Sequence, residues 1–210
     1  RVALAQRNAL ESEALGVQRE LLPKVGLDSS YAMVLSGIRR CGKSTLLRQV
    51  IKANKDYYYF NFDDSRVEGF GLSDFERLEQ VFAEEFGESD NYFFDEIQNV
   101  PKWELFVRGG LDRKKHFLIT GSNASLLSRE LGTRLTGRHL TRELFPFSYR
   151  EFLSFTLKTA GAASFSDYLK KGGFPEYLKD GRQETLQRLF SDVLARDILV
   201  RHGLRSVKEV

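Results

Sequence analysis

The stretch of this chain best suited to chemistry is glycine-rich and lies between a strand-like apolar run and a helix-like run. Gly37–Thr45 reads Gly-Ile-Arg-Arg-Cys-Gly-Lys-Ser-Thr and fits the phosphate-binding pattern G-x-x-x-x-G-K-[ST], the P-loop, at every position. Its glycines let the backbone curl so that successive N–H groups point at a phosphate, and a helix beginning near Lys43 adds the positive end of its dipole. We predict that Lys43 reaches the β- and γ-phosphates of a nucleotide and that the Ser44 hydroxyl binds Mg²⁺. The predicted cofactor-binding residues of the loop are Gly37, Arg39, Arg40, Cys41, Gly42, Lys43, Ser44 and Thr45.

Two acidic residues follow the strand-like run Asn91–Phe94. In enzymes with a P-loop, the first acid at such a strand end holds Mg²⁺, and we assign this role to Asp95. The second, Glu96, sits where a carboxylate can polarise a water toward the γ-phosphate. Any strand can end in a turn with Asp and Glu, but only one strand–helix unit separates this pair from the loop, which favours the functional interpretation.

Polar residues also follow the strand-like run His116–Gly121. Ser122 and Asn123 can contact the γ-phosphate or the attacking water from that position. Asn123 can equally cap the helix expected over 124–131, and both roles can hold together.

Four arginines recur over the next stretch of the chain, namely Arg129, Arg134, Arg138 and Arg142. An arginine near the end of this unit could reach the γ-phosphate of a neighbouring subunit as an arginine finger. An equally good alternative is a solvated basic face or a patch that binds the phosphates of nucleic acid. The sequence leaves both interpretations open.

Alternating strand-like and helix-like runs must position these residues. The strand-like runs occupy 32–35, 57–62, 91–94, 116–121 and about 136–144. The aromatic run 57–62 invites a nucleic-acid interpretation, but a buried strand of a parallel sheet is favoured. Helices are expected over 46–52, from a capping box at Ser73–Glu76 through Phe86, and from Pro101 in a first helical turn.

From Pro146 the pattern becomes helical, with a second capping box at Ser148–Glu151 and a last helix over 182–200. We predict an α/β fold in which a parallel five-stranded P-loop NTPase sheet is flanked by helices and followed by a small helical lid. The expected division is an N-terminal helical segment (1–29), a P-loop core (30–145) and the lid (146–210).

The composition is that of a soluble globular protein, with 41% hydrophobic and 29% charged residues among 210. A net charge of +3 does not by itself imply nucleic acid as a partner. The single cysteine excludes a disulfide framework and suggests a reducing, cytoplasmic compartment. No apolar run approaches the roughly 18 residues of a membrane span, so no membrane partner is expected.

The order of these features resembles the AAA+ ATPases, over about residues 30–205. It is most similar to a prokaryotic branch with a Gly-x-Arg-Arg-x-Gly-Lys-Ser loop and an Asp-Glu-Ile-Gln strand end, here Gly37–Ser44 and Asp95–Gln98. Further similar stretches are Thr120–Asn123, Phe145–Phe152 and Gly172–Pro175. In that family an uncharacterised C-terminal domain normally follows, and this chain stops where it would begin.

The resemblance implies ATP or ADP and Mg²⁺ as cofactors, with Glu96 activating water. It implies a γ-phosphate sensor at Ser122 or Asn123 and a finger at Arg138, with Arg134 as second choice. The implied catalytic residues are Glu96, Lys43, Ser122, Asn123, Arg138 and Arg134, and the implied metal ligands are Ser44 and Asp95.

One departure from the AAA+ pattern lies at the turn Gly173–Glu176, which lacks the arginine that many AAA+ lids place there. The turn is more similar to the Gly-x-Pro turn of STAND-type nucleotide switches, whose proline contacts adenine, which makes Pro175 a predicted nucleotide contact. We also expect the segment before the first strand to fold over the base, with Val17 and Arg19 nearby.

Two functions therefore stay open. The first is Mg²⁺-dependent ATP hydrolysis that drives a conformational change in the lid and the C-terminal domain. The second is a slow, STAND-like nucleotide switch or binding module with little turnover. A kinase is disfavoured, because a glutamate at Glu96 suits water activation. A homo-oligomer, an unknown protein partner and nucleic acid all remain open as partners.

Overall fold

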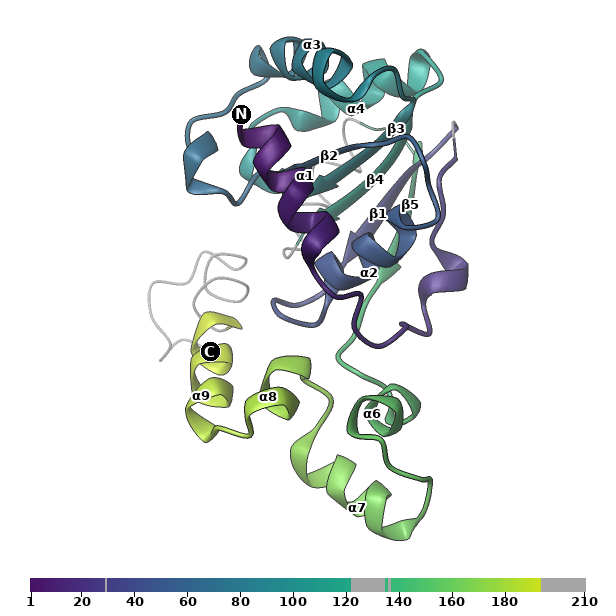
Figure 1. The fold of residues 1–210 in the computed structure, drawn as a ribbon, viewed down its shortest axis with the longest axis vertical. Coiled ribbons are helices and arrows are strands. Elements are labelled where there is room, and N and C mark those ends of the chain that lie inside the picture. The colour runs from purple at the N-terminus through teal and green to yellow at the C-terminus, as the bar shows by residue number, and fades with distance from the viewer. Residues whose placement is uncertain (29, 122–134, 136, 194–210) are drawn as a thin grey trace.

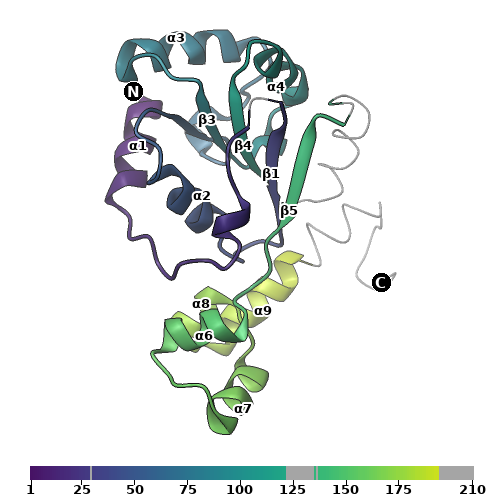
Figure 2. The same cartoon turned by 90° about the vertical axis from the view of Figure 1, so that its right-hand side faces the viewer.

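The computed structural model describes residues 1–28, 30–121, 135 and 137–193, and the fold is given for these. Five parallel strands form one sheet in the order β2-β3-β4-β1-β5. The strands are β1 (Ala32–Ser36), β2 (Tyr58–Asn61), β3 (Asn91–Asp95), β4 (His116–Gly121) and β5 (His139–Glu143). Helices flank the sheet, as Figures 1 and 2 show, so the α/β prediction is confirmed.

Helices cover both faces of the sheet because successive side chains of a strand point to opposite sides. In β1, Ala32 and Val34 face a core shared with α3 (Asp74–Phe86) and α4 (Trp103–Asp112). Met33 and Leu35 face a second core, shared with α2 (Lys43–Ile51). Strands buried on both faces read as continuous apolar runs, which is why they are visible in the sequence.

The aromatic run at β2 belongs to these two cores. Tyr58, Phe60 and Phe62 pack in the core under α3, and Tyr57 and Tyr59 pack in the core under α2. The buried-strand prediction is therefore confirmed for this run, and the nucleic-acid interpretation of it is wrong.

The edge of β2 is covered by α1 (Val2–Ser12). The side-chain amide of Gln6 donates to the Asn61 carbonyl at 3.0 Å and accepts from the Asn61 N–H at 2.9 Å. One side chain thus supplies the hydrogen bonds that a further strand would make, which protects an edge otherwise open to pairing. Within the described part of the chain, no helix is long and apolar enough to cross a membrane.

Four helices follow β5 and lie beyond the end of the sheet toward which the strands run (Figures 1 and 2). They are α6 (Tyr149–Thr156), α7 (Ala162–Lys171), α8 (Pro175–Asp180) and α9 (Gln183–Asp192), and we call them the C-terminal helices. The capping box that opens α6 is confirmed: the Glu151 N–H donates to Ser148 Oγ, and the Ser148 N–H donates to Glu151 Oε2. The predicted last helix is described through Asp192, and the rest of it lies outside the described residues.

Two local predictions are wrong. Ser73 already has helical backbone angles and makes no capping hydrogen bond; instead Asp74 Oδ2 accepts from the Gly71 N–H at 2.9 Å. Pro101 precedes α4 rather than lying in its first turn, because the left-handed residue Lys102 separates the two. Both differences arise from loop conformations that a short motif does not determine. The helix expected over 124–131 lies outside the described residues.

Adjacent glycines in α4 give a matched test of the core beneath this helix. A Cβ at Gly110 would collide with the fully buried ring of Phe117, whereas a Cβ at Gly109 would make an ordinary contact with Arg113 at 3.8 Å. We expect Gly110→Ala to lower the free energy of unfolding by about 1–3 kcal/mol, measured by urea denaturation. Gly109→Ala, the control, should raise it by about 0.5–1 kcal/mol. Equal effects at the two positions would contradict the packing described here.

Candidate nucleotide site

The glycine-rich loop and the acidic pair meet at the edge of the sheet that is formed by the carboxyl ends of its strands. β1 leads into the loop at Gly37, β3 ends at Asp95, and β4 carries Thr120 near its end. Because β3, β4 and β1 are parallel neighbours, their carboxyl ends lie side by side. This edge is where open α/β sheets bind ligands.

Close approaches explain two glycines of the loop. A Cβ at Gly37 (φ 152°) would collide with the Leu144 carbonyl, and one at Gly42 (φ 102°) would lie 2.7 Å from Arg19 Nη1. Both φ values fall in the region that favours glycine. Between them, the side chain of Cys41 is fully buried in the core under α2, and burial raises the pKa of its thiol. Cys41 can therefore contact a phosphate only through its backbone.

The Lys43 ammonium lies within the loop and faces Glu96. Its Nζ donates to the carbonyls of Gly37 (2.9 Å) and Ile38 (3.3 Å) and lies 3.7 Å from Glu96 Oε1. Gln98 Nε2 donates to the other carboxylate oxygen, Glu96 Oε2, at 2.6 Å. Glu96 itself has a left-handed backbone (φ 53°), which is uncommon for a residue with a side chain. The backbone thus aims the carboxylate, and the amide of Gln98 holds one of its oxygens.

Asp95 is buried beside two hydroxyl groups. Thr120 Oγ1 donates to Asp95 Oδ1 and accepts from the Glu96 N–H at 3.1 Å, so one threonine ties both acids. Burial raises the pKa of the Asp95 carboxyl, and hydrogen bonds from Thr120 and Ser44 act against that rise. Carboxylate and hydroxyl oxygens suit Mg²⁺, which usually keeps several waters and takes further ligands from phosphates. Ser44 and Asp95 fit such a site; among the described residues, no group of three or more His, Cys, Asp or Glu could hold a metal ion.

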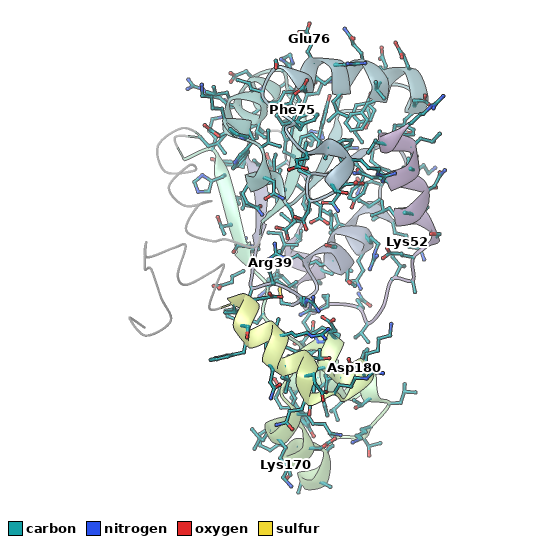
Figure 3. The ribbon with its side chains drawn as sticks, turned by 90° about the vertical axis from the view of Figure 1, so that its left-hand side faces the viewer. Arg39, Lys52, Phe75, Glu76, Lys170 and Asp180 are labelled. Atoms are coloured by element: carbon teal, nitrogen blue, oxygen red, sulfur yellow. The ribbon has the colours of Figure 1, made fainter. Side chains whose placement is uncertain are left out.

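Two adjoining cavities lie over the loop. The first, about 340 Å³, is lined by charged residues that include Lys43, Glu96 and Arg40, and we call it the phosphate cavity. The second, about 330 Å³, is more apolar and is lined by Val17 and Phe147 among others; we call it the base cavity. Residues shared by the two cavities are Gly42, Thr45, Pro175 and Glu176. Figure 3 shows the labelled Arg39, which lines the phosphate cavity, between the sheet and the C-terminal helices.

The side-chain amide of Gln49 in α2 binds the segment before β1 at three points. Gln49 Nε2 donates to the carbonyls of Leu15 (2.8 Å) and Val17 (2.7 Å), and its Oε1 accepts from the Arg19 N–H (3.0 Å). These three bonds hold the segment at the wall of the base cavity. Val17 and Pro175 therefore lie at the same cavity although they are far apart in the sequence.

Arg19, which was expected near the base, lines the base cavity and also has a structural position that the sequence did not suggest. Its side chain is 2% exposed and pairs with Glu151, which is 4% exposed, at 2.8 Å between Nε and Oε1. The remaining nitrogens donate to the carbonyls of Cys41 and Phe145, each at 2.7 Å. Burial alone would raise the pKa of Glu151, but hydrogen bonds from Arg19 and from the N–H groups of Glu20 and Ser148 outweigh it and leave the pKa lowered. Arg19 thus joins the loop to the beginning of the C-terminal helices.

Arg138 lies opposite the loop, at the edge of the sheet that is formed by the amino ends of its strands. It immediately precedes β5, its carbonyl accepts from the Ala32 N–H at the beginning of β1, and its guanidinium pairs with Asp112 at 2.5 Å. A five-residue strand is about 16 Å long, so Arg138 is too far from Lys43 to act on a phosphate held by its own chain. The candidates Ser122, Asn123 and Arg134 lie outside the described residues.

Several residues of the site escaped prediction. Thr120, Gln98, Gln49 and Glu176 each contact the site through partners that are distant in sequence or, for Gln98, through a backbone turn at Glu96. The Asp-Glu-Ile-Gln and Thr-Gly-Ser-Asn stretches contained two of them, but nothing in a single sequence marks which side chains turn toward the acids.

Comparisons with known proteins agree with this geometry. Residues 29–153 match the family model described as an AAA domain. An uncharacterised protein of Methanocaldococcus jannaschii is 34% identical over 194 residues, which are 84% of this chain and 44% of the relative. An uncharacterised protein of Haemophilus influenzae is 32% identical over 196 residues, 85% of this chain and 48% of the relative. The chain thus spans less than half the length of these relatives.

Two solved structures align with this chain at low sequence identity. AMPPCP-bound DnaA from Aquifex aeolicus aligns with a TM-score of 0.50 at 13% identity, over 99% of this chain and 68% of DnaA. A Walker-type ATPase of Pyrococcus abyssi aligns with a TM-score of 0.45 at 17% identity, over 85% and 71% of the two chains.

The buried pair of Arg19 and Glu151 gives a stability test. Arg19→Met leaves the Glu151 carboxylate buried without its cation, so we expect the free energy of unfolding to fall by about 3–5 kcal/mol in urea denaturation. Arg150→Met is the control, because Arg150 is 85% exposed and pairs with Glu20 at 3.3 Å, a surface contact worth at most about 1 kcal/mol. Adding Glu151→Gln to Arg19→Met should recover part of the loss. Similar losses for Arg19→Met and Arg150→Met would show that the buried pair is not a structural joint.

Proposed function

Because this chain belongs to the AAA domain family, we propose that it binds ATP with Mg²⁺ and hydrolyses it, and that the nucleotide state changes the position of the C-terminal helices. The observation that carries the proposal is the convergence of Lys43, Asp95 and Glu96 at the phosphate-binding loop. The proposed division is a helical segment (1–29), a core (30–145) and a lid (146–210), followed in the full-length protein by a C-terminal domain.

The proposed nucleotide lies across the two cavities. Its phosphates occupy the loop, where Lys43 exchanges the carbonyls of Gly37 and Ile38 for phosphate oxygens. Its base lies in the more apolar cavity between Val17 and Pro175. The similar fold of AMPPCP-bound DnaA supports an adenine nucleotide.

The proposed reaction is in-line attack of water on the γ-phosphorus. Mg²⁺ at Ser44 and Asp95 would supply positive charge to the phosphate oxygens. Glu96 Oε1, which faces Lys43, accepts a proton from the attacking water as the new P–O bond forms and the bond to ADP breaks. Gln98 holds the other carboxylate oxygen, and Thr120 fixes the backbone of Glu96, so the base is oriented before the nucleotide arrives.

A slow nucleotide switch is the second candidate. It is favoured by the contribution of α8 to the phosphate cavity, which is a proline and a carboxylate, Pro175 and Glu176, rather than an arginine. In that case ATP and ADP act mainly as conformational ligands.

Two further parts of the proposal concern partners. The position of Arg138 at the far edge of the sheet means that it would act as a finger only on the nucleotide of a second copy, in a homo-oligomer. We further propose a cytoplasmic location. An unknown protein partner and nucleic acid are the other candidate partners.

Replacement of Glu96 tests the assignment of the base. In the full-length protein, Glu96→Gln should keep ATP affinity within about threefold and lower the turnover of ATP by about 10²-fold or more. Glu85→Gln, which removes the same charge from the exposed surface of α3, should leave both unchanged. Affinity is measured by calorimetry and turnover by phosphate release.

The outcomes separate the two functions. Equal hydrolysis by wild type and Glu96→Gln would contradict the role of Glu96 as base. Tight binding of ADP by wild type with negligible turnover would favour the switch.

A further inference from the structure

A carboxylate from the C-terminal helices lies in the phosphate cavity. Glu176, in the first turn of α8, lines this cavity, and its Oε1 accepts a hydrogen bond from Arg40 Nη1 of the loop. The two residues are 136 positions apart in the sequence, so their contact links the loop directly to α8. The side chain of Arg40 is 45% exposed and that of Glu176 is 42% exposed.

The charges of this cavity make Glu176 unexpected. Arg39, Arg40 and Lys43 line it and suit a polyanion, and Glu96 has the proposed role of base. Glu176 has no such role, and its negative charge opposes a phosphate in the same space. A guanidinium binds carboxylate and phosphate oxygens through the same N–H groups, so the two anions compete for Arg40.

Glycines lie on both sides of α8, and their surroundings differ. Gly172 (φ 70°) and Gly181 (φ 66°) lie at the two ends of the turn and helix, both in the left-handed region and with open space where a Cβ would be. Gly173 is fixed, because the Phe147 N–H donates to its carbonyl at 2.7 Å and a Cβ there would collide with the Phe147 backbone. Gly173 therefore fixes the turn into α8 against the Phe147 backbone.

We propose that Glu176 is the residue through which α8 responds to the phosphates: it pairs with Arg40 when the cavity is empty and is displaced when a phosphate takes Arg40. The inference rests on the proposed nucleotide site. By linkage, any ligand that displaces Glu176 binds more weakly by the cost of breaking the pair, and removal of the pair raises the affinity. An ion pair this exposed is weak, which suits a contact that must open and close.

The test is a double-mutant cycle on nucleotide affinity in the full-length protein. Dissociation constants for ADP and for AMPPCP, each with Mg²⁺, are measured by calorimetry for wild type, Glu176→Gln, Arg40→Ala and the double variant. We expect Glu176→Gln to bind about two- to fivefold more tightly than wild type. In the Arg40→Ala background the same substitution should gain clearly less, because the pair is already absent. Glu184→Gln is the control, an exposed acid in the first turn of α9, and should match wild type.

Three results would overturn the inference. Unchanged affinity in Glu176→Gln would show that the carboxylate does not oppose the nucleotide. An equal gain with and without Arg40 would show that Glu176 acts by general repulsion rather than through the pair. Failure of wild type to bind either nucleotide would remove the proposed function itself, and so is distinguishable from the first two.

Discussion

The rest of this structure depends on a guanidinium group that is buried where three chain segments meet. Arg19 belongs to the segment before β1. Its side chain donates to the carbonyl of Cys41 in the loop and pairs with Glu151 at the start of the C-terminal helices. A charge removed from water is costly unless its donors are matched, and here Glu151 and the carbonyls of Cys41 and Phe145 all accept from Arg19. The same contact explains why position 42 is glycine, since Gly42 packs against the guanidinium. The loop and the C-terminal helices are therefore joined at one fixed point.

Because that joint is fixed, the nucleotide site can be divided between two parts of the molecule. The loop and the end of β3 contribute Lys43 and the two acids, whereas α8 contributes Pro175 and Glu176 to both cavities and Lys179 to the base cavity. The buried pair at Glu151 resists separation, and the exposed pair at Glu176 does not. A strong contact at the joint and a weak one across the cavity would let α8 move while the loop keeps its shape, which is what coupling between phosphate and helix position requires.

Much of this architecture was predictable because short stretches of sequence determine it. Apolar runs buried on both sheet faces identified β1 to β4, whereas β5 has no fully buried residue and carries no such run. The loop motif located the anion-binding turn beside Lys43. Contacts between distant segments were not predictable. The sequence suggested that Arg19 lies near the base. Its role as a joint shows only in the structure, where the fold brings it to Glu151, which is 132 residues away in the sequence. The parallel register of β1 and β5 places Arg138 at the amino ends of the strands, so it stays a candidate only for the nucleotide of a second copy. Ser73 shows the converse limit, since its sequence fits a capping box but its backbone is already helical and its side chain makes no capping hydrogen bond.

The central claim is that one nucleotide is held jointly by the loop, the segment before β1 and the turn into α8. Hydrogen exchange of the full-length protein with and without ADP and Mg²⁺ tests it most directly. The account predicts slower exchange in three separate segments, 15–19, 37–45 and 173–178, and little change in α3, which lies on the opposite face of the sheet from α2. Protection confined to 37–45, with the other two segments unchanged, would contradict the shared site.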